Sequence, residues 1–473
     1  MREVSLREVL DARDRRAEAQ RQLLERYARP LISFTMNIPG PVKDSPMIRR
    51  AFDEGLRMLD DALGEAGIVC ASRQITHADT GNEFLCAVKA SAAAVKEICM
   101  RIEDGSPMGR LFDMDVIGLD AQKLARKEER RCLVCGALGR GCASRRLHSL
   151  DELNAAVARL LREGLLAADA DRADAMVTQA LLDEVATTPK PGLVDQNNNG
   201  SHRDITLQTF RLSAESLRGY WRDCFLLGAE TAELPAGEAF ARMRGRGMEA
   251  EGKMLAATGG VNTHKGAVFT LGTVCGALGR LWRPDAPCRD PGRIAAACAA
   301  LCSESVEKDF AALRLSGTTH TAGERLYLRG GLRGIRGEVA AGLPAVLETG
   351  LPILEACLAE GMSRNDAGVI ALLHLIARGE DTNMIRRGGP ALAGETSARL
   401  RDELRENALP TMERVRQLDE LFIRSNLSPG GCADLLAVSF FLHDLREHAG
   451  SDHGTEIEPR PGAAAVPAAA EGS

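Results

Sequence analysis

The spacing of the apolar residues changes once along the chain, near residue 150, and this change constrains the fold more than any other feature. Before it, the apolar residues of 32–38, 84–88 and 112–116 alternate with polar or small residues, a pattern typical of strands. Between them, 5–28 and 92–102 have the apolar spacing of helices. The first third of the chain is therefore expected to be a mixed α/β domain.

Beyond this point the strand pattern disappears and helical spacing takes over. Within 172–186, Met176, Val177, Ala180 and Leu181 form one apolar stripe. Further helices are expected at 266–281, 293–302, 366–377 and 398–424. The expected organisation is a mixed α/β N-terminal domain (1–165), a larger all-α domain (170–448), and a disordered low-complexity C-terminal tail (449–473).

Composition excludes several classes of protein. No apolar run approaches the ~20 residues of a membrane helix, and the charged first 22 residues do not resemble a signal peptide. A net charge of −6 and an aromatic content of 4% give no reason to expect nucleic-acid binding. We expect a cytoplasmic protein that binds neither nucleic acid nor membrane.

The 13 cysteines are scattered and follow no secretory signal, which indicates reduced thiols. Only Cys132, Cys135 and Cys142 lie close together, and with His148 they have a spacing that a zinc knuckle could use. A structural zinc is nevertheless disfavoured here, because the spacing fits loosely and no second CxxC pair is present.

The same loop has a second interpretation, which we prefer, as an anion-binding loop. Arginine forks pair well with phosphate. The basic residues concerned are Arg140, Arg145, Arg146 and His148.

An acidic pair marks the expected strand at 112–116. Alternation places Asp113 and Asp115 on one face of that strand. Two carboxylates can hold Mg²⁺ together with substrate phosphates, although a solvated strand face would show the same pattern. Arg110 and Lys43 add cations suited to phosphate.

Three strings of this region, SFTMNIPGPVKDSPMIRRAF, GRLFDMDVIG and CLVCGALGRGCASRRLHS, resemble the citrate lyase holo-acyl-carrier-protein synthase family. The resemblance implies transfer of a phosphoribosyl-dephospho-coenzyme A group to a serine of the apo acyl carrier protein, the gamma subunit of citrate lyase, with release of pyrophosphate. It implies a metal on Asp113 and Asp115 and phosphate binding by the basic residues. The segment Cys142–Arg146 is one residue shorter than the family pattern, which affects the roles of Arg145 and His148.

Five polar strings interrupt the helical part, at 188–204, 259–269, 317–327, 379–389 and 426–437. Single strings of this kind often only cap helices, but five together favour one converging site. Lys265 and Gly266 at a helix start suit a phosphate, without the residue order of a Walker A loop. His374, within an apolar run, is expected to be a core histidine.

All five strings resemble the triphosphoribosyl-dephospho-coenzyme A synthase family over about residues 170–445. That resemblance implies a reaction that joins the ribose of ATP to dephospho-coenzyme A and expels adenine. The implied catalytic residues are Asp195, Asp204, His264, His320 and Asp381. The implied metal ligands here are Asp381 and Asp434. The implied substrate- and phosphate-binding residues are Lys190, Asn262, Lys265, Glu324, Arg325, Asn383, Ser428 and Gly430. Two extra residues separate His320 from Glu324 relative to the family pattern.

The sequence thus predicts a bifunctional, Mg²⁺-dependent transferase that uses ATP and 3′-dephospho-coenzyme A to build and install the prosthetic group of citrate lyase. One alternative is the same synthesis serving malonate decarboxylase. Another is a zinc-stabilised module that binds the carrier without catalysis.

Overall fold

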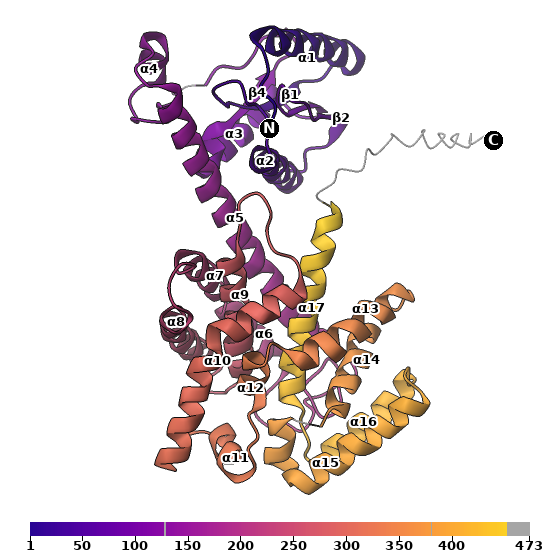
Figure 1. Ribbon diagram of the computed structural model, residues 1–473. Helices are drawn as coiled ribbons and strands as arrows, with labels where there is room; N and C mark the ends of the chain where they lie inside the picture. Colours follow the sequence, from indigo (N-terminus) through magenta and orange to yellow (C-terminus); the bar gives the residue numbers. More distant parts are fainter. Residues whose placement is uncertain (127–128, 380, 452–473) are drawn as a thin grey trace, which may run out of the picture.

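The computed structural model describes residues 1–126, 129–379 and 381–451, and Figure 1 shows a small sheet-containing part above a larger helical part. The expected fold class, mixed α/β and then all-α, is confirmed. The last helix extends to Ser451, so the first residues assigned to a tail are helical. The remainder of the expected tail, 452–473, lies outside the described residues.

The N-terminal part is a four-stranded antiparallel sheet with helices on both faces (Figure 1). The strand order is β2-β3-β1-β4, which makes β2 and β4 the edge strands. The elements are α1 (Leu6–Tyr27), β1 (Leu31–Met36), α2 (Pro46–Glu65), β2 (Cys70–Thr76), β3 (Glu83–Val88), α3 (Ala92–Gly105), a 3₁₀ turn (Met108–Leu111), β4 (Phe112–Ile117) and α4 (Gly139–Arg145).

The alternating residues of the strands divide between two faces. On one face Phe34 stacks on Phe52 of α2, with ring centroids 4.8 Å apart, and meets Phe112 edge-on. On the other face α1 places Leu23 against Leu31 and neighbouring apolar side chains. Successive side chains of a strand point to opposite faces of the sheet, and the apolar side chains on each face must be buried under helices.

Two elements of this part escaped prediction. Helix α2 was not recognised, although Ser45 caps it and a proline begins it. Strand β2 was also missed, because as an edge strand it is mostly exposed and its sequence CASRQIT lacks alternating apolar residues.

The C-terminal part is helical throughout its described residues, and no helix there or elsewhere in the described ranges is long and apolar enough to cross a membrane. Its elements are α5 (Leu150–Ala186), α6 (Leu207–Ser216), α7 (Tyr220–Glu230), α8 (Ala236–Ala257), α9 (Lys265–Leu281), α10 (Pro291–Ser316), α11 (Ala322–Gly330), α12 (Gly334–Ala340), a π-helical turn (Val346–Gly350), α13 (Leu351–Ala359), α14 (Arg364–Ala377), α15 (Thr382–Glu406), α16 (Met412–Arg424) and α17 (Gly430–Ser451).

Close packing through small residues, expected from the Ala- and Gly-rich sequence, is confirmed where α7 meets α9. A Cβ on Gly228 would lie 2.1 Å from the carbonyl oxygen of Gly276, so the two backbones touch. One expectation was wrong: the helix predicted at 398–424 is two helices, because the chain leaves α15 at Asn407 and passes through Pro410 before α16 begins.

A single helix joins the two parts. Helix α5 runs for 37 residues, about 55 Å at 1.5 Å per residue, from beside the sheet into the helical part (Figure 1). The Ala- and Asp-rich stretch at 164–174, where the two expected domains adjoin, is the middle of this helix.

A buried polar cluster fastens α5 to both parts. The Asp169 carboxylate accepts two hydrogen bonds from Arg50 of α2, each 2.9 Å, and one of 2.8 Å from the Trp282 indole N–H after α9. Arg172, one turn further along α5, pairs with Asp169 at 3.0 Å and with the buried Glu54 of α2 at 2.7 Å. Asp169 therefore bonds to elements of both parts at once.

We predict that Asp169→Asn lowers the free energy of unfolding by about 3 kcal/mol, because it removes the buried carboxylate paired with Arg50 and leaves Arg172 only its pair with Glu54. Urea denaturation measures this change. The matched control is Asp171→Asn on the same helix, whose ion pair with Arg222 is exposed and should change stability by less than about 0.5 kcal/mol. Equal effects of the two substitutions would contradict the role given to Asp169.

Candidate active sites

The N-terminal candidate site lies on edge strand β4. Asp113 and Asp115 stand opposite Thr35 and Ser33 of β1 and share the face that α1 partly covers, as the alternation predicted. Both aspartates are half-buried, and Asp115 pairs with the exposed Lys123. Two carboxylates at a sheet margin are open to a metal–phosphate ligand.

The outer edge of β4 is held by side chains. Buried Glu103 of α3 accepts a 2.7 Å hydrogen bond from the backbone N–H of Met114, and Lys96 donates to the Met114 carbonyl at 3.2 Å. Arg130 donates to the Phe112 carbonyl at 2.7 Å. These bonds satisfy the strand's otherwise free edge, and they fix the backbone that carries the two aspartates.

The cations expected to bind phosphate in this part differ in their partners and in their exposure. Lys43 donates to the carbonyl of Ile38, and its partial burial lowers its pKa. Arg110 donates to the carbonyls of Arg131 and Cys132, at 3.3 and 3.0 Å. Arg145 is exposed, while His148 gathers with the three nearby cysteines. The anion-binding role of these residues stays a prediction.

The C-terminal candidate site forms where three helices begin. The first residues of α17 touch the N-terminus of α9 through Asp434 and the N-terminus of α15 through Cys432. Helix N-termini present free N–H groups and a positive dipole end. Three of them meeting in one place form a site suited to anions.

Asp381 is the buried N-cap of α15. Its Oδ1 accepts from the backbone N–H groups of Asn383 and Met384, at 2.8 and 2.9 Å, and its Oδ2 accepts from that of Cys432 at 2.9 Å. Burial outweighs these bonds and raises its pKa. Asn383 lies beside Gly430, whose Cβ would meet the amide nitrogen at 2.9 Å.

Asp434 lies against the start of α9, where a glycine makes room for it. A Cβ on Gly266 would lie 1.9 Å from Oδ2 of Asp434, and the backbone N–H of Ala267 donates to this carboxylate. Burial, followed by the charges of Glu184 and Asp381, raises the pKa of Asp434 well above its usual value. No arginine or lysine pairs with Asp381 or Asp434 among the residues that the structure describes.

Lys190 and Glu184 form a buried ion pair beside these acids. The Lys190 ammonium donates to a Glu184 carboxylate oxygen at 2.6 Å and to the Glu184 carbonyl at 2.8 Å. Sequence reasoning missed Glu184. It could have been found as an acidic residue on the apolar stripe of α5, seven residues after Val177.

Asp195 shapes the loop that follows α5. Its carboxylate accepts from the backbone N–H groups of Lys190, Asn197 and Asn198 at 2.7 to 3.0 Å. Asp419 of α16 holds the same loop by accepting from the Gly192 N–H and the Asn198 amide. Both carboxylates are used within the loop, which favours a positioning role for Asp195 over direct catalysis.

His264 is buried at the start of α9. Its Nδ1 bonds to the Ser213 hydroxyl at 2.7 Å, and its Nε2 is buried with no hydrogen-bond partner in the described structure. Burial, followed by the charge of Lys190, lowers its pKa to about 3, so the imidazole is neutral at pH 7. A neutral ring with a free buried nitrogen suits hydrogen bonding to a substrate better than proton donation.

Other expected residues lie on the outer side of this site. Lys265 is exposed and pairs with Glu251 at 2.7 Å, and Asn262 is exposed. Ser428 is buried and bonds to His202 at 2.8 Å. Asp204 is exposed, near enough to raise the pKa of His202 slightly against the larger lowering by burial.

The segment with the two extra residues forms a helix cap. Glu324 accepts from the backbone N–H of Thr321 at 2.9 Å while Thr321 caps α11, a capping box. His320 and Arg325 are exposed. Within the described residues no hydrogen bond or ion pair joins these three to Asp381 or Asp434, and their catalytic and binding roles stay predictions.

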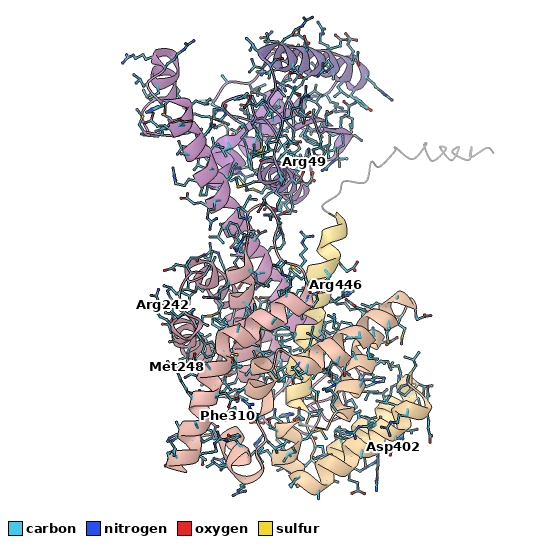
Figure 2. All side chains as sticks on the ribbon, viewed as in Figure 1. Arg49, Arg242, Met248, Phe310, Asp402 and Arg446 are labelled. Atoms are coloured by element: carbon cyan, nitrogen blue, oxygen red, sulfur yellow. The ribbon has the colours of Figure 1, made fainter. Side chains whose placement is uncertain are left out.

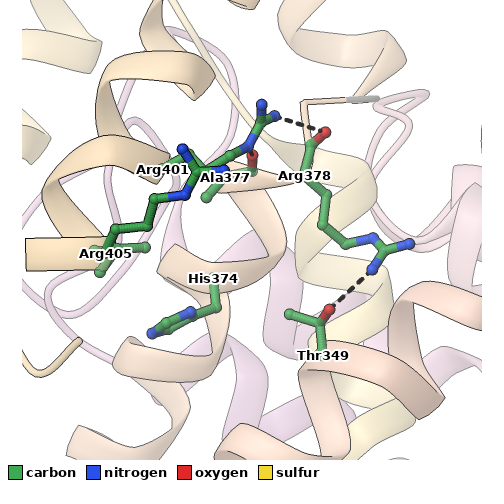
Figure 3. A pocket seen from close by; sticks show the side chains of 7 residues that line it. Thr349, His374, Ala377, Arg378, Arg401 and Arg405 are labelled. Carbon is green, nitrogen blue, oxygen red and sulfur yellow. Dashed lines mark hydrogen bonds between the residues drawn. The ribbon is translucent and has the colours of Figure 1, made fainter.

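A cationic pocket elsewhere proves to be structural. His374, expected in the core, is half-buried and lines a cavity of about 260 Å³ with Arg378, Arg401 and Arg405 (Figure 3). Arg401 donates to the carbonyls of Ala377 and Arg378 at the end of α14, and the dashed lines in Figure 3 show Arg378 bonding to Thr349 at 3.0 Å. Arg401 thus caps the C-terminal end of α14, where a cation is favoured.

Comparison with known proteins places both parts in families. Residues 4–164 match the model described as apo-citrate lyase phosphoribosyl-dephospho-CoA transferase. Residues 170–453 match the model described as ATP:dephospho-CoA triphosphoribosyl transferase. The expected boundary between the parts, at 165–170, falls inside α5.

Three curated relatives are similar to this chain, two of them over nearly its whole length. The chain is 32% identical over 469 residues to "Protein CitXG" of Haemophilus influenzae, covering 94% of this chain and 97% of the relative. It is 31% identical over 460 residues to "Protein CitXG" of Leuconostoc mesenteroides, covering 93% and 97%. It is 39% identical over 272 residues, 57% of this chain and 89% of the relative, to "Probable 2-(5''-triphosphoribosyl)-3'-dephosphocoenzyme-A synthase" of Citrobacter koseri.

These matches cover both candidate sites. The chain is a transferase that belongs to the ATP:dephospho-CoA triphosphoribosyl transferase family through its helical part and to the apo-citrate lyase phosphoribosyl-dephospho-CoA transferase family through its sheet part.

Proposed function

We propose that the helical part joins ATP to 3′-dephospho-coenzyme A. The ribose hydroxyl of dephospho-coenzyme A attacks the ribose carbon that bears adenine, a C–O bond forms, and the C–N bond to adenine breaks. The hydroxyl proton is lost and adenine leaves with a proton, while the triphosphate stays on the new ribose. The product is 2′-(5″-triphosphoribosyl)-3′-dephospho-coenzyme A.

The observation that carries this proposal is the meeting of the N-termini of α9, α15 and α17 around Asp381 and Asp434. The positive dipole ends of these helices favour a triphosphate, while N–H groups at their starts hold the carboxylates of Asp381 and Asp434 in place. An oxocarbenium-like ribose needs a nearby negative charge, and the same carboxylates supply it.

The donor set around these carboxylates fits Mg²⁺. Mg²⁺ favours one or two carboxylates together with substrate phosphates, and Asp381 and Asp434 are acids with raised pKa and no cationic side-chain partner in the described structure. When bound there, the metal would neutralise triphosphate charge. Lys190 is already paired with Glu184, so it adds little free positive charge.

The residues of the chain itself then position the two substrates. His264 presents its free Nε2 as a hydrogen-bonding group. Asp195 holds the loop of Lys190 in place. Asn383, next to Gly430 at the start of α17, is placed to bind a polar group of the substrate.

We propose that the sheet part uses this product. A serine hydroxyl of an apo acyl carrier protein attacks the phosphorus nearest the ribose, a P–O bond forms to the serine, and pyrophosphate leaves. Asp113 and Asp115 are the expected Mg²⁺ ligands, because they share the accessible face of β4. The carrier is that of citrate lyase, and the reaction takes place in the cytoplasm.

We predict that Asp113→Asn reduces carrier loading by about 100-fold or more, because it removes charge needed to hold a metal on the triphosphate. Adenine release should remain at the wild-type rate, since Asp113 lies outside the helical part. Intact-mass spectrometry of the carrier and chromatography of adenine measure the two steps.

The matched control for this test is Asp61→Asn, an exposed aspartate of α2, which should leave both steps unchanged. Parallel reactions with the apo-carrier of malonate decarboxylase distinguish the two carriers. Loss of both steps in folded Asp113→Asn protein would contradict one site per part.

We predict that Asp434→Asn has two opposite effects. Adenine release should fall by about 100-fold or more, because a metal ligand is lost. The free energy of unfolding at pH 7 should rise, because the raised pKa of Asp434 means that its ionisation is disfavoured in the folded state.

The sign of the pH dependence follows from that raised pKa. Ionisation of Asp434 costs stability as the pH rises above about 4, the unfolded value, so the advantage of Asp434→Asn should grow with pH and vanish near pH 4. Urea denaturation across this range measures it. Asp402→Asn, at an exposed site on α15 labelled in Figure 2, is the control, and a less stable Asp434→Asn would contradict the account.

A further inference from the structure

Residues 129–149, between β4 and α5, have almost no apolar core. Figure 1 shows helix α4 of this segment projecting beyond the sheet. Of its side chains that the structure describes, only Cys132 and Cys142 are buried, while Leu138 and Leu147 are 63% and 57% exposed. A short segment without a core generally needs a cross-link or a metal to hold one fold.

Four metal-binding side chains meet inside this segment. The thiols of Cys132, Cys135 and Cys142 and a ring nitrogen of His148 all lie within 4.8 Å of one another. The Sγ atoms of Cys135 and Cys142 are 3.4 Å apart. Tetrahedral zinc with ~2.3 Å bonds to sulfur places its ligand sulfurs about 3.7 Å apart, so small side-chain movements would complete the geometry.

The backbone of the first pair is a tight turn that brings the two cysteines together. The Cys132 N–H donates to the Ala137 carbonyl at 2.7 Å, and the Gly136 N–H donates to the Cys132 carbonyl at 3.1 Å. Gly136 has φ +73°, in the left-handed region that glycine enters without strain. The sequence Cys-x-x-Cys-Gly is therefore folded into a hairpin that holds both sulfurs on one side.

The fourth side chain lacks a partner that a metal would supply. Nε2 of His148 is buried and has no hydrogen-bond partner in the described structure. A buried polar atom left unpaired costs free energy and calls for an explanation. His148 follows α4, where the Leu147 N–H closes the turn onto the Cys142 carbonyl at 3.1 Å.

We propose that Cys132, Cys135, Cys142 and His148 bind one Zn²⁺ as a structural site. Three thiolates and an imidazole form a soft, tetrahedral donor set that selects zinc over Mg²⁺. Four protein ligands leave no open position for a substrate, so the metal holds structure and takes no part in the transfer chemistry. This proposal gives His148 a different role from the anion-binding loop that the neighbouring arginines favoured in the sequence.

This zinc would also support the N-terminal candidate site. Arg110, just before β4, donates to the carbonyls of Arg131 and Cys132, and Arg130 donates to the Phe112 carbonyl. These bonds tie the turn of the first two cysteines to the beginning of the strand that carries Asp113. The metal site therefore belongs to the framework of that strand.

The test is a metal analysis of the full chain purified under reducing conditions and dialysed against metal-free buffer. We expect one zinc per chain, and we expect Co²⁺ in its place to give the thiolate charge-transfer absorption of a tetrahedral site. Alkylation followed by mass spectrometry should show Cys132, Cys135 and Cys142 protected until a strong chelator is added. Reduced chain that takes up no zinc, or cobalt spectra without thiolate bands, would overturn the proposal.

Variants locate the metal within the chain. Cys142→Ser and His148→Ala should lose zinc, whereas His148→Cys, which keeps four ligands, should retain it. Cys70→Ser, at a half-buried thiol of β2 outside the cluster, is the matched control and should retain one zinc. Full zinc in Cys142→Ser, or a Cys135–Cys142 disulfide in place of the metal in the wild-type chain as isolated, would contradict the assignment.

Discussion

The relative placement of the two parts depends on one buried carboxylate, that of Asp169 in the middle of α5. It binds Arg50 from the sheet part and the Trp282 indole from the helical part at the same time. A continuous helix fixes distance and direction, and this cluster fixes rotation about the helix. The two candidate sites are therefore held in a defined geometry and are not tethered by a flexible linker. Any gain in the effective concentration of the intermediate from joining the two parts depends on that fixed geometry.

Both candidate sites are built on backbone that side chains hold in place. At β4, Glu103, Lys96 and Arg130 satisfy the free edge of the strand beneath Asp113 and Asp115. At the start of α17, Asp381 binds the N–H of Cys432, and Gly266 leaves room for Asp434. Keeping Asp434 ionised next to Glu184 and Asp381 costs stability, and a bound Mg²⁺ would offset that cost. The site is therefore arranged for its ligands more than for the stability of the free protein.

The spacing of the apolar residues and the local chemistry of the polar strings made much of the fold predictable. Strands β1, β3 and β4 and the common face of Asp113 and Asp115 follow from alternation, while edge strand β2 has no such pattern because water covers most of it. The polar strings around Asp381 and Asp434 were recognisable. Their meeting at three helix starts was not, since it depends on how α9, α15 and α17 pack. Glu184 and Ser213 escaped notice for the same reason.

The Cys–His cluster had a readable spacing, but only the folded turn at Gly136 shows that its four ligand atoms meet. Glu324, matched to a substrate role by resemblance, also takes part in a helix cap that the sequence reasoning did not consider.

On the proposed function, one chain performs two successive transfers at two separate sites. Complementation between variants tests it most directly: Asp113→Asn and Asp434→Asn proteins are mixed with ATP, dephospho-coenzyme A, Mg²⁺ and apo-carrier, and the intact mass of the carrier is measured. The account predicts that neither variant alone loads the carrier and that the mixture does, since one supplies the intermediate that the other uses. A mixture as inactive as its components, although each variant is folded and retains its own remaining step, would contradict it.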